Sequence, residues 1–365
     1  MSKAVFQNIA ITAIATTVGD NVIKLQDEKE RFGFDDDSLA RIQKSIGLKT
    51  RYIASPGVCA SDLCVQSANT IFDNTDIKKE DIGALIFVTQ SPDYKAPSTA
   101  IVMQDRLALP NDCLAFDINL GCSGFIYGLF TAFSYVNSGI NKILLCVGDV
   151  NDYFAGEKDR IFTPLMGDAG SAIVIEKTPS PKSFFSLYSN GGGYKHLIIP
   201  YGGARNRTTS ESILPKQQTD GGIRSDEDMF MDGKEVFNFA IKTVPSLIKD
   251  ILQDADILAK DIDYFVLHQA NPYILKTIAS RLKVAKEKVP LQTGKIYGNQ
   301  NSASIPGTIN GFLSDEFQNK KLTLCIAGFG IGLSWGAAVI QTNKIYAPFA
   351  QIYSDAKNTP TKDIR

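Results

Sequence analysis

A cysteine, Cys122, stands where a strand-like run passes into a helix-like run. Between 114 and 131, the residues up to Ile118 are mostly apolar, and the apolar residues after Gly124 recur at helical spacing. We expect the chain to turn near Gly121, which places Cys122 on the first turn of the following helix. Unpaired backbone N–H groups and the helix dipole favour a thiolate at such a position.

The neighbours of this cysteine are small. Gly121, Ser123 and Gly124 permit a sharp turn and leave room for a substrate carbonyl beside the backbone. This combination is typical of a nucleophile, but most free cysteines are simply small buried apolar residues. Taken alone, Cys122 does not decide between the two interpretations.

Two further polar residues follow apolar runs. His268 ends a buried strand-like run and precedes a helix-like pattern, and Asn299 lies in a turn of small residues that leads into another helix-like pattern. Singly, such a histidine is usually structural, and such an asparagine usually serves its backbone conformation. With Cys122, however, they supply a nucleophile and two groups able to bind a developing oxyanion.

The elements that must position these groups repeat along the chain. Two stretches recur at nearly one offset: 79–88 matches 259–268, and 142–148 matches 321–328. The shared offset predicts a duplicated α/β unit with halves at 1–178 and 179–365, divided at a proline-marked boundary. Functional loops of both halves should then meet in one crevice.

Composition excludes several classes of protein. The 365 residues are 44% hydrophobic, enough for two core units, and the net charge of −1 gives no indication of a nucleic-acid partner. No apolar run approaches the ~18 residues of a membrane span, and there is no signal-peptide pattern, so a cytoplasmic location without a membrane partner is expected. The six cysteines form no C-x-x-C pair and there are two histidines, so no metal site is expected.

Four signatures together resemble the β-ketoacyl-acyl-carrier-protein synthase III family of the thiolase-like superfamily. They are the strand–cysteine–helix segment, the His-Gln-Ala-Asn motif at 268–271, the Gly-Asn-x-x-Ser-Ala-Ser turn at 298–304 and the glycine-rich stretch at 328–336. The resemblance spans essentially the whole chain. It implies the thiolase-like α/β fold, in which two duplicated halves stack as five αβαβα layers, and a homodimer.

The resemblance also implies a decarboxylating Claisen condensation, in fatty-acid initiation or a specialised acyl pathway. Cys122 would carry the acyl group as a thioester, while His268 and Asn299 bind the carbonyl of a malonyl-type extender. Backbone N–H groups of Cys122, Gly330 and Ile331 would meet the oxyanion. No cofactor is implied, because acyl-coenzyme A or acyl-carrier-protein thioesters are the substrates and the carrier protein is the partner.

Further residues match the family's substrate-binding positions. By resemblance, Arg160 would touch the nucleotide end of coenzyme A, Phe237 and Asn271 would line the pantetheine tunnel, and Leu333 would lie at the substrate site. Ala96 stands where the family has a bulky aromatic residue that limits the acyl pocket across the dimer. We therefore expect an acyl group longer than acetyl.

Other positions depart from the family. The region 39–47 lacks the tryptophan and arginine that stack around adenine, although Arg41 is adjacent, and Tyr273 replaces an arginine. A carrier protein, or a thioester donor other than acetyl-coenzyme A, thus becomes more credible. The alternatives are an acyltransferase that passes the acyl group to an oxygen or nitrogen acceptor, or a non-catalytic ketosynthase-like subunit.

One segment, 201–228, is longer than its counterpart in the family. It is polar and glycine-rich, which is typical of a lid or a partner-docking surface but also of a disordered segment. Its basic residues Arg205, Arg207 and Arg224 could contact the phosphate or an acidic helix of a carrier protein.

Overall fold

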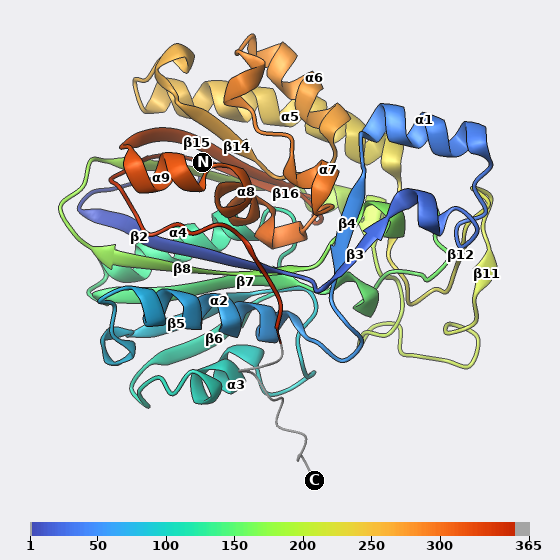
Figure 1. Cartoon of the computed structure of the whole chain (residues 1–365), viewed down its shortest axis with the longest axis horizontal. Helices are drawn as coiled ribbons and strands as arrows, with labels where there is room; N and C mark the ends of the chain where they lie inside the picture. Colours follow the sequence, from blue (N-terminus) through green and yellow to red (C-terminus); the bar gives the residue numbers. More distant parts are fainter. Residues whose placement is uncertain (1, 355–365) are drawn as a thin grey trace.

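Two large mixed β-sheets form the frame of the protein, seen in a computed structural model that describes residues 2–354 (Figure 1). The first sheet, in spatial order, consists of β17 (Gln351–Ile352), β2 (Ile9–Val18), β8 (Ala169–Lys177), β7 (Lys142–Asp149), β5 (Ala84–Val88) and β6 (Leu114–Ile118). The second consists of β1 (Ser2–Phe6), β9 (Ser183–Ser189), β16 (Ser334–Thr342), β15 (Leu322–Gly330) and β14 (Tyr264–Leu267).

The central strands of the two sheets have the same topology. β2, β8 and β7 are successively antiparallel, and β7 is parallel to β5. In the second sheet, β9, β16 and β15 are successively antiparallel, and β15 is parallel to β14. The recurring stretches of the sequence fall on β5 and β14 and on β7 and β15, so the predicted duplication is confirmed.

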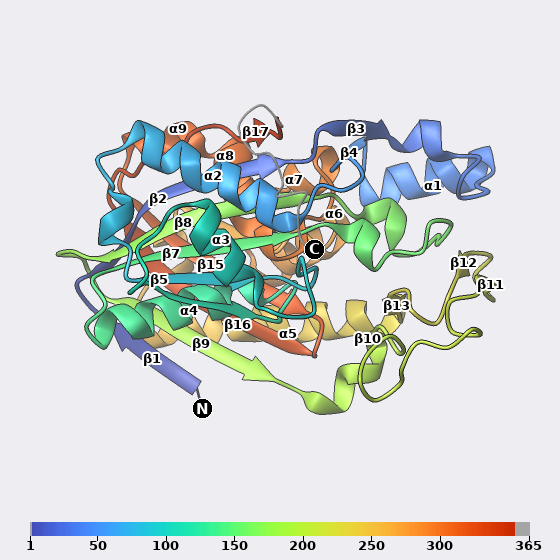
Figure 2. The same ribbon diagram turned by 90° about the horizontal axis from the view of Figure 1, so that it is seen from below.

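Helices complete five layers (Figures 1 and 2). The outer face of the first sheet is covered by α2 (Ala60–Asn74) and α3 (Thr99–Arg106), and that of the second by α5 (Gly233–Asp254) and α6 (Pro272–Leu282). Between the sheets lie α4 (Gly124–Asn137) and α8 (Ser304–Phe312). Because helices cover both faces, central strands such as β5 are buried at every residue. The predicted five-layered αβαβα fold is confirmed.

Smaller elements surround this frame. They are the helices α1 (Asp36–Ile46), α7 (Thr293–Ile296) and α9 (Ser314–Asn319), and the short strands β3 (Asn21–Lys24), β4 (Thr50–Ile53), β10 (Leu197–Ile198), β11 (Lys216–Gln217), β12 (Ile223–Arg224) and β13 (Phe230–Met231). Within the described residues, no helix is long and apolar enough to cross a bilayer.

The ends of the chain exchange sheets. β1 pairs with β9 of the second sheet, whereas β17 pairs with β2 of the first. The predicted boundary between 1–178 and 179–365 falls in the connection from β8 to β9, but each half thus contributes an edge strand to the sheet of the other.

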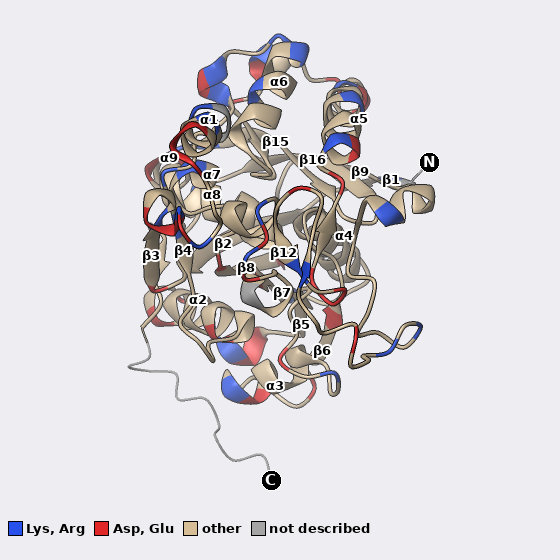
Figure 3. Cartoon of the chain, turned by 90° about the vertical axis from the view of Figure 1, so that its right-hand side faces the viewer, with Lys and Arg blue, Asp and Glu red and all other residues tan. Residues whose placement is uncertain are grey.

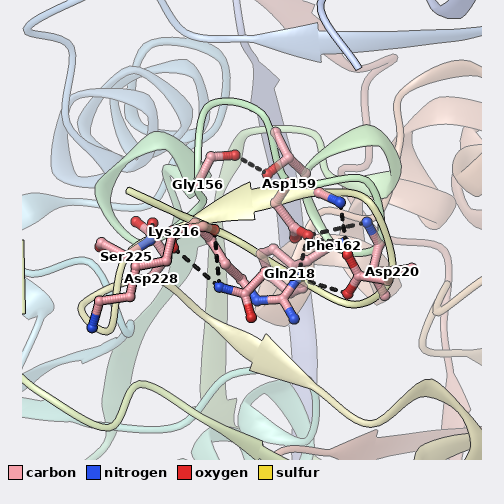
Figure 4. A network of polar contacts seen from close by, with 12 residues as sticks. Gly156, Asp159, Phe162, Lys216, Gln218, Asp220, Ser225 and Asp228 are labelled. Atoms are coloured by element: carbon pink, nitrogen blue, oxygen red, sulfur yellow. Dashed lines mark hydrogen bonds and ion pairs between the residues drawn. The ribbon is translucent and has the colours of Figure 1, made fainter. Parts of the chain in front are cut away.

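The 201–228 segment packs onto residues 156–162 through a polar network (Figure 4). Arg224 is only 9% exposed, and its guanidinium Nη1 lies 3.0 Å from carboxylate oxygens of both Asp159 and Asp220. The expectation that Arg224 contacts a partner is therefore wrong, because its charge is already neutralised within the chain. Arg205 and Arg207 are exposed.

The aromatic cluster between the sheets sets much of the stability. The Phe185 ring of β9 is buried, and its centroid lies 5.1 to 6.0 Å from the rings of Phe6, Phe130 and Phe133. Phe185→Ala should therefore lower the free energy of unfolding by about 3–5 kcal/mol, measured by urea titration. The control Phe349→Ala, at a ring that is 58% exposed, should change it by less than about 0.5 kcal/mol. Equal effects would contradict this account of the core.

Candidate active site

One cavity of about 380 Å³ is lined by Cys122, His268 and Asn299 together. They come from three different connections: Cys122 follows β6 and His268 follows β14, whereas Asn299 lies between the short helix α7 and α8. The expectation that Asn299 also follows a strand is therefore wrong. The wall of the cavity is otherwise mostly apolar. The structure thus brings together the three groups that the sequence analysis selected as a nucleophile and two oxyanion-binding groups.

Cys122 precedes the helix rather than lying on its first turn. α4 begins at Gly124 with Ser123 as its N-cap, so the predicted position within the helix is wrong. Part of the cysteine surface faces the cavity, but protein atoms enclose the rest, and this burial raises the pKa of the thiol to about 11. Hydrogen bonds from the N–H groups of Ile331 and of Cys122 itself oppose the shift, while the charge of Asp149 adds to it. The resting residue is a thiol.

A glycine brings β15 against the cysteine. A Cβ atom on Gly330 would lie 2.7 Å from the Cys122 sulfur, so no larger residue fits without displacing it. This close approach places the next residue, Ile331, where its N–H reaches the sulfur. Of the predicted oxyanion donors, the N–H groups of Cys122 and Ile331 therefore both point at the reacting atom, and Gly330 supplies the space.

His268 is buried and neutral. Its Nδ1 lies 2.8 Å from the Ser304 hydroxyl, which accepts a hydrogen bond from the Gln269 N–H at 3.3 Å. The hydroxyl proton is then free to bond Nδ1, an arrangement that favours the imidazole tautomer with its proton on Nε2. Burial lowers the pKa of His268 to about 4. A hydrogen bond from the ring to the backbone carbonyl of Asn301 opposes this shift, because it favours the protonated form. The neutral ring can thus donate a hydrogen bond through Nε2–H without carrying a charge.

The carboxamide of Asn299 is oriented by its own loop. Its Oδ1 accepts the N–H of Asn301 at 3.0 Å, which leaves the Nδ2 donors unused by the described residues. Backbone hydrogen bonds tie Asn299 to Leu165 and Gly167 at 2.8 and 3.0 Å. A Cβ atom on Gly167 would lie 1.9 Å from the Tyr297 carbonyl oxygen, so a glycine is required where these two segments cross.

Three polar residues of the site were not selected from the sequence. Gln90 and Asn301 line the cavity, and Asp149 lies behind them with no exposed surface. Gln90 and Asp149 each follow an apolar strand-like run, which is the signal that identified His268. That signal could have found them, but nothing in the sequence indicates that they meet.

The predicted substrate-binding residues separate into groups. Phe237 and Asn271 line the cavity; Phe237 stacks on Tyr273 at 5.5 Å between centroids, and the Asn271 Oδ1 caps α6 by accepting the Ile274 N–H. Leu333 is not among the residues that line it. It packs against Gly193 instead, so the structure does not support its prediction as a substrate contact.

Arg160 and Ala96 lie elsewhere. The Arg160 guanidinium sits 4.9 Å over the Phe34 ring and, with Arg41, lines an adjoining cavity of about 370 Å³ that shares Leu165 with the first. Cationic side chains therefore do lie beside the 39–47 region, with Phe34 as an aromatic neighbour. Ala96 is exposed in the connection between β5 and α3, and its place across a dimer stays a prediction.

Comparisons with known proteins find similarity in both halves of the chain. Residues 116–191 match the family model of 3-oxoacyl-[acyl-carrier-protein (ACP)] synthase III, and residues 252–342 match the model of its C-terminal part. The chain is 36% identical to a putative 3-oxoacyl-[acyl-carrier-protein] synthase 3 of Campylobacter jejuni, over 97% of this chain and 100% of that protein. It is 33% identical to a β-ketoacyl-[acyl-carrier-protein] synthase III of Caldanaerobacter subterraneus, over 82% and 88% of the two chains.

A solved structure is similar over the whole fold. The 3-oxoacyl-(acyl-carrier protein) synthase from Burkholderia xenovorans LB400 superposes with a TM-score of 0.89 at 32% identity, covering 96% of this chain and 99% of that one.

The protonation state of Cys122 has a measurable consequence. Because the pKa of the thiol is raised to about 11, its thiolate fraction, and with it alkylation by iodoacetamide, should rise about tenfold per pH unit from pH 7 to 9. The rate is followed by mass spectrometry of the Cys122 peptide, with Cys122→Ala as the background control. A plateau below pH 8 would show that the thiol is activated in the resting protein.

Proposed function

We propose roles for individual residues in the Claisen condensation of acyl thioesters, because the chain belongs to the 3-oxoacyl-[acyl-carrier-protein] synthase III family. The observation that carries the proposal is the convergence of a thiol, a neutral imidazole and an unused carboxamide donor in one apolar cavity. Two half-reactions follow from these groups.

In the first half-reaction, Cys122 is acylated. Its sulfur attacks the carbonyl carbon of the donor thioester, the bond to the donor sulfur breaks, and the proton of Cys122 leaves with the released thiol. The oxyanion formed in between accepts hydrogen bonds from the N–H groups of Cys122 and Ile331, which already face the sulfur. A thiol suits this step because it is a good nucleophile and later a good leaving group.

In the second half-reaction, the malonyl-type extender loses carbon dioxide. Nε2–H of His268 and the Nδ2 group of Asn299 donate hydrogen bonds to its thioester carbonyl and stabilise the enolate that remains. The enolate carbon attacks the acyl carbon on Cys122, and the carbon–sulfur bond breaks to give the β-ketoacyl product and the Cys122 thiolate, which takes a proton from solvent to return to the resting thiol. Because His268 stays neutral above its pKa of about 4, it polarises the carbonyl without adding a charge.

The roles can be separated by substitution. Cys122→Ala should abolish the mass gained by the protein from acyl thioesters, because the attacking sulfur is gone. His268→Ala and Asn299→Ala should keep acylation but slow carbon dioxide release and β-ketoacyl formation from malonyl-carrier protein by about 100-fold each. Intact-protein mass spectrometry and radiolabelled carbon dioxide measure the two steps. Acylation of the unchanged protein without carbon dioxide release would instead favour transfer to an oxygen or nitrogen acceptor.

A cluster of lysines supports a carrier protein as partner. Lys24, Lys49, Lys276 and Lys295, here called the lysine site, line a shallow depression of about 650 Å³ that contains no acidic residue. It lies where α1, α6, α7, β3 and β4 meet, elements that are grouped together in Figure 3. Among residues 2–354, none of these ammonium groups is engaged in an ion pair.

The lysine site adjoins the active cavity through one helix. Lys276 lies on α6, and residues at the start of the same helix line the cavity. Since the net charge of the chain is only −1, this local excess of positive charge would guide an acidic surface to the entrance. We assign it to the acidic helix of an acyl-carrier protein.

Charge reversal tests this assignment. The double variant Lys49→Glu and Lys276→Glu should raise KM for carrier-protein thioesters at least about tenfold, since like charges then repel, but leave KM for coenzyme A thioesters unchanged. Lys182→Glu, at an exposed lysine outside the lysine site, is the matched control. A parallel loss with both donors would place the effect in the active cavity instead.

A homodimer is also proposed. β6 is an edge strand of the first sheet, and apolar side chains near it are exposed in the single chain: Leu114 at 43%, Ile101 at 48% and Tyr94 at 38%. Burying this edge against a second copy would satisfy its open backbone groups and cover these side chains. It would also bring the loop with Ala96 to the partner subunit.

A further inference from the structure

Two carboxamide side chains, Gln90 and Asn301, meet beside the nucleophile. The Nδ2 group of Asn301 donates to the Oε1 atom of Gln90 at 3.5 Å, and both residues line the cavity of Cys122. A Cβ atom on Gly121 would lie 2.2 Å from Gln90 Oε1 and 2.8 Å from Asn301 Oδ1. The glycine before the nucleophile therefore leaves the space in which the two amides meet. They are called the amide pair below.

The amide pair has unused hydrogen-bonding capacity. Within the described residues, Nε2 of Gln90 donates to no group and Oδ1 of Asn301 accepts from none. Both side-chain amide atoms of Gln300 are buried without a hydrogen-bond partner, but these two atoms of the amide pair are not in that situation. The pair thus presents N–H donors, those of Gln90 Nε2 among them, and one unused acceptor oxygen, Oδ1 of Asn301, to a cavity whose walls are mostly apolar.

Both members of the pair are held in place. The Gln90 N–H donates to Oδ1 of Asp149 at 2.7 Å, and the other oxygen of Asp149 accepts from the Ser302 hydroxyl at 2.9 Å. Asn301 has a left-handed backbone with φ of 49°, and its N–H donates to Asn299. The main chains that carry both amides are therefore fixed, and the hydrogen bond at 3.5 Å joins the two side chains to each other, which reduces the ordering that a ligand must impose.

The chemistry of the pair selects its ligand. A hydroxyl group can accept from Gln90 and donate to Asn301 at the same time, whereas an alkyl chain satisfies neither and leaves both without water. A carboxylate can accept from the N–H groups but has no proton to donate to the Asn301 oxygen, so that oxygen would face a negative charge without a partner. The extender's carboxylate is therefore a poor occupant of this place.

We propose that the amide pair selects acyl donors that carry a hydroxyl group close to the thioester carbonyl, that is, hydroxyacyl thioesters. The closeness follows from Gly121, which directly precedes Cys122 and on which a Cβ atom would collide with both amides. This inference rests on the proposed role of Cys122 as the acyl carrier. It adds a polar contact to an acyl site that is otherwise apolar.

The acylation half-reaction tests the proposal, because no extender is present. The whole protein is mixed with the pantetheine thioesters of butanoate and of each enantiomer of 3-hydroxybutanoate, and the rate of mass gain on Cys122 is measured. One enantiomer should acylate the unchanged protein at least about tenfold faster than butanoate. In Gln90→Met, which keeps the side-chain length and the backbone bond to Asp149, this ratio should fall toward one.

A matched variant controls for changes in cavity shape. Met229→Leu alters the apolar wall of the same cavity and should keep the preference for the hydroxyacyl donor. Equal rates with hydroxylated and plain donors in the unchanged protein would overturn the inference, as would a ratio that Gln90→Met leaves intact. It would also be overturned if Gln90→Met changed KM for the malonyl extender alone. No acylation of Cys122 by any thioester would instead refute its role as acyl carrier, and this inference with it.

Discussion

The buried carboxylate of Asp149 joins the two halves of the active site. It stands at the end of β7 with no exposed surface and accepts hydrogen bonds from the Gln90 N–H and from the N–H and hydroxyl of Ser302. Gln90 belongs to the half that carries the nucleophile, whereas Ser302 lies in the loop that carries Asn299. Burial raises the pKa of Asp149 to about 7 despite these bonds. Because a buried carboxylate is costly without its donors, losing any of them would weaken the contact between the two halves of the site.

This buried setting also explains the state of the nucleophile. The helix start after Cys122 and two backbone N–H groups favour a negative sulfur, but the loss of solvent around the thiol outweighs them. In the reaction that we propose, these N–H groups donate to the charge that develops during acyl transfer. The same apolar surroundings keep His268 neutral, so both halves of the reaction begin from uncharged groups.

The sequence predicts the frame and the reacting groups, because both leave local patterns. Apolar runs at a common offset specify two related sheets, and the ends of such runs mark Cys122 and His268. A turn of small residues, not a strand, marks Asn299. Contacts between distant segments leave no such pattern. The sequence predicts Arg224 as a free surface cation, but the fold brings Asp159 to it. The sequence predicts Leu333 at the substrate site, but its side chain packs against Gly193.

The exchange of edge strands binds the two halves into one unit. A protein that arose by gene duplication could in principle be cut at its internal joint into two self-sufficient modules. Here the strand that completes the second sheet is made first, at β1, and the strand that closes the first sheet is made last, at β17. During synthesis on the ribosome, the first sheet therefore lacks an edge until almost the whole polypeptide has emerged, and neither module can finish folding before the other exists.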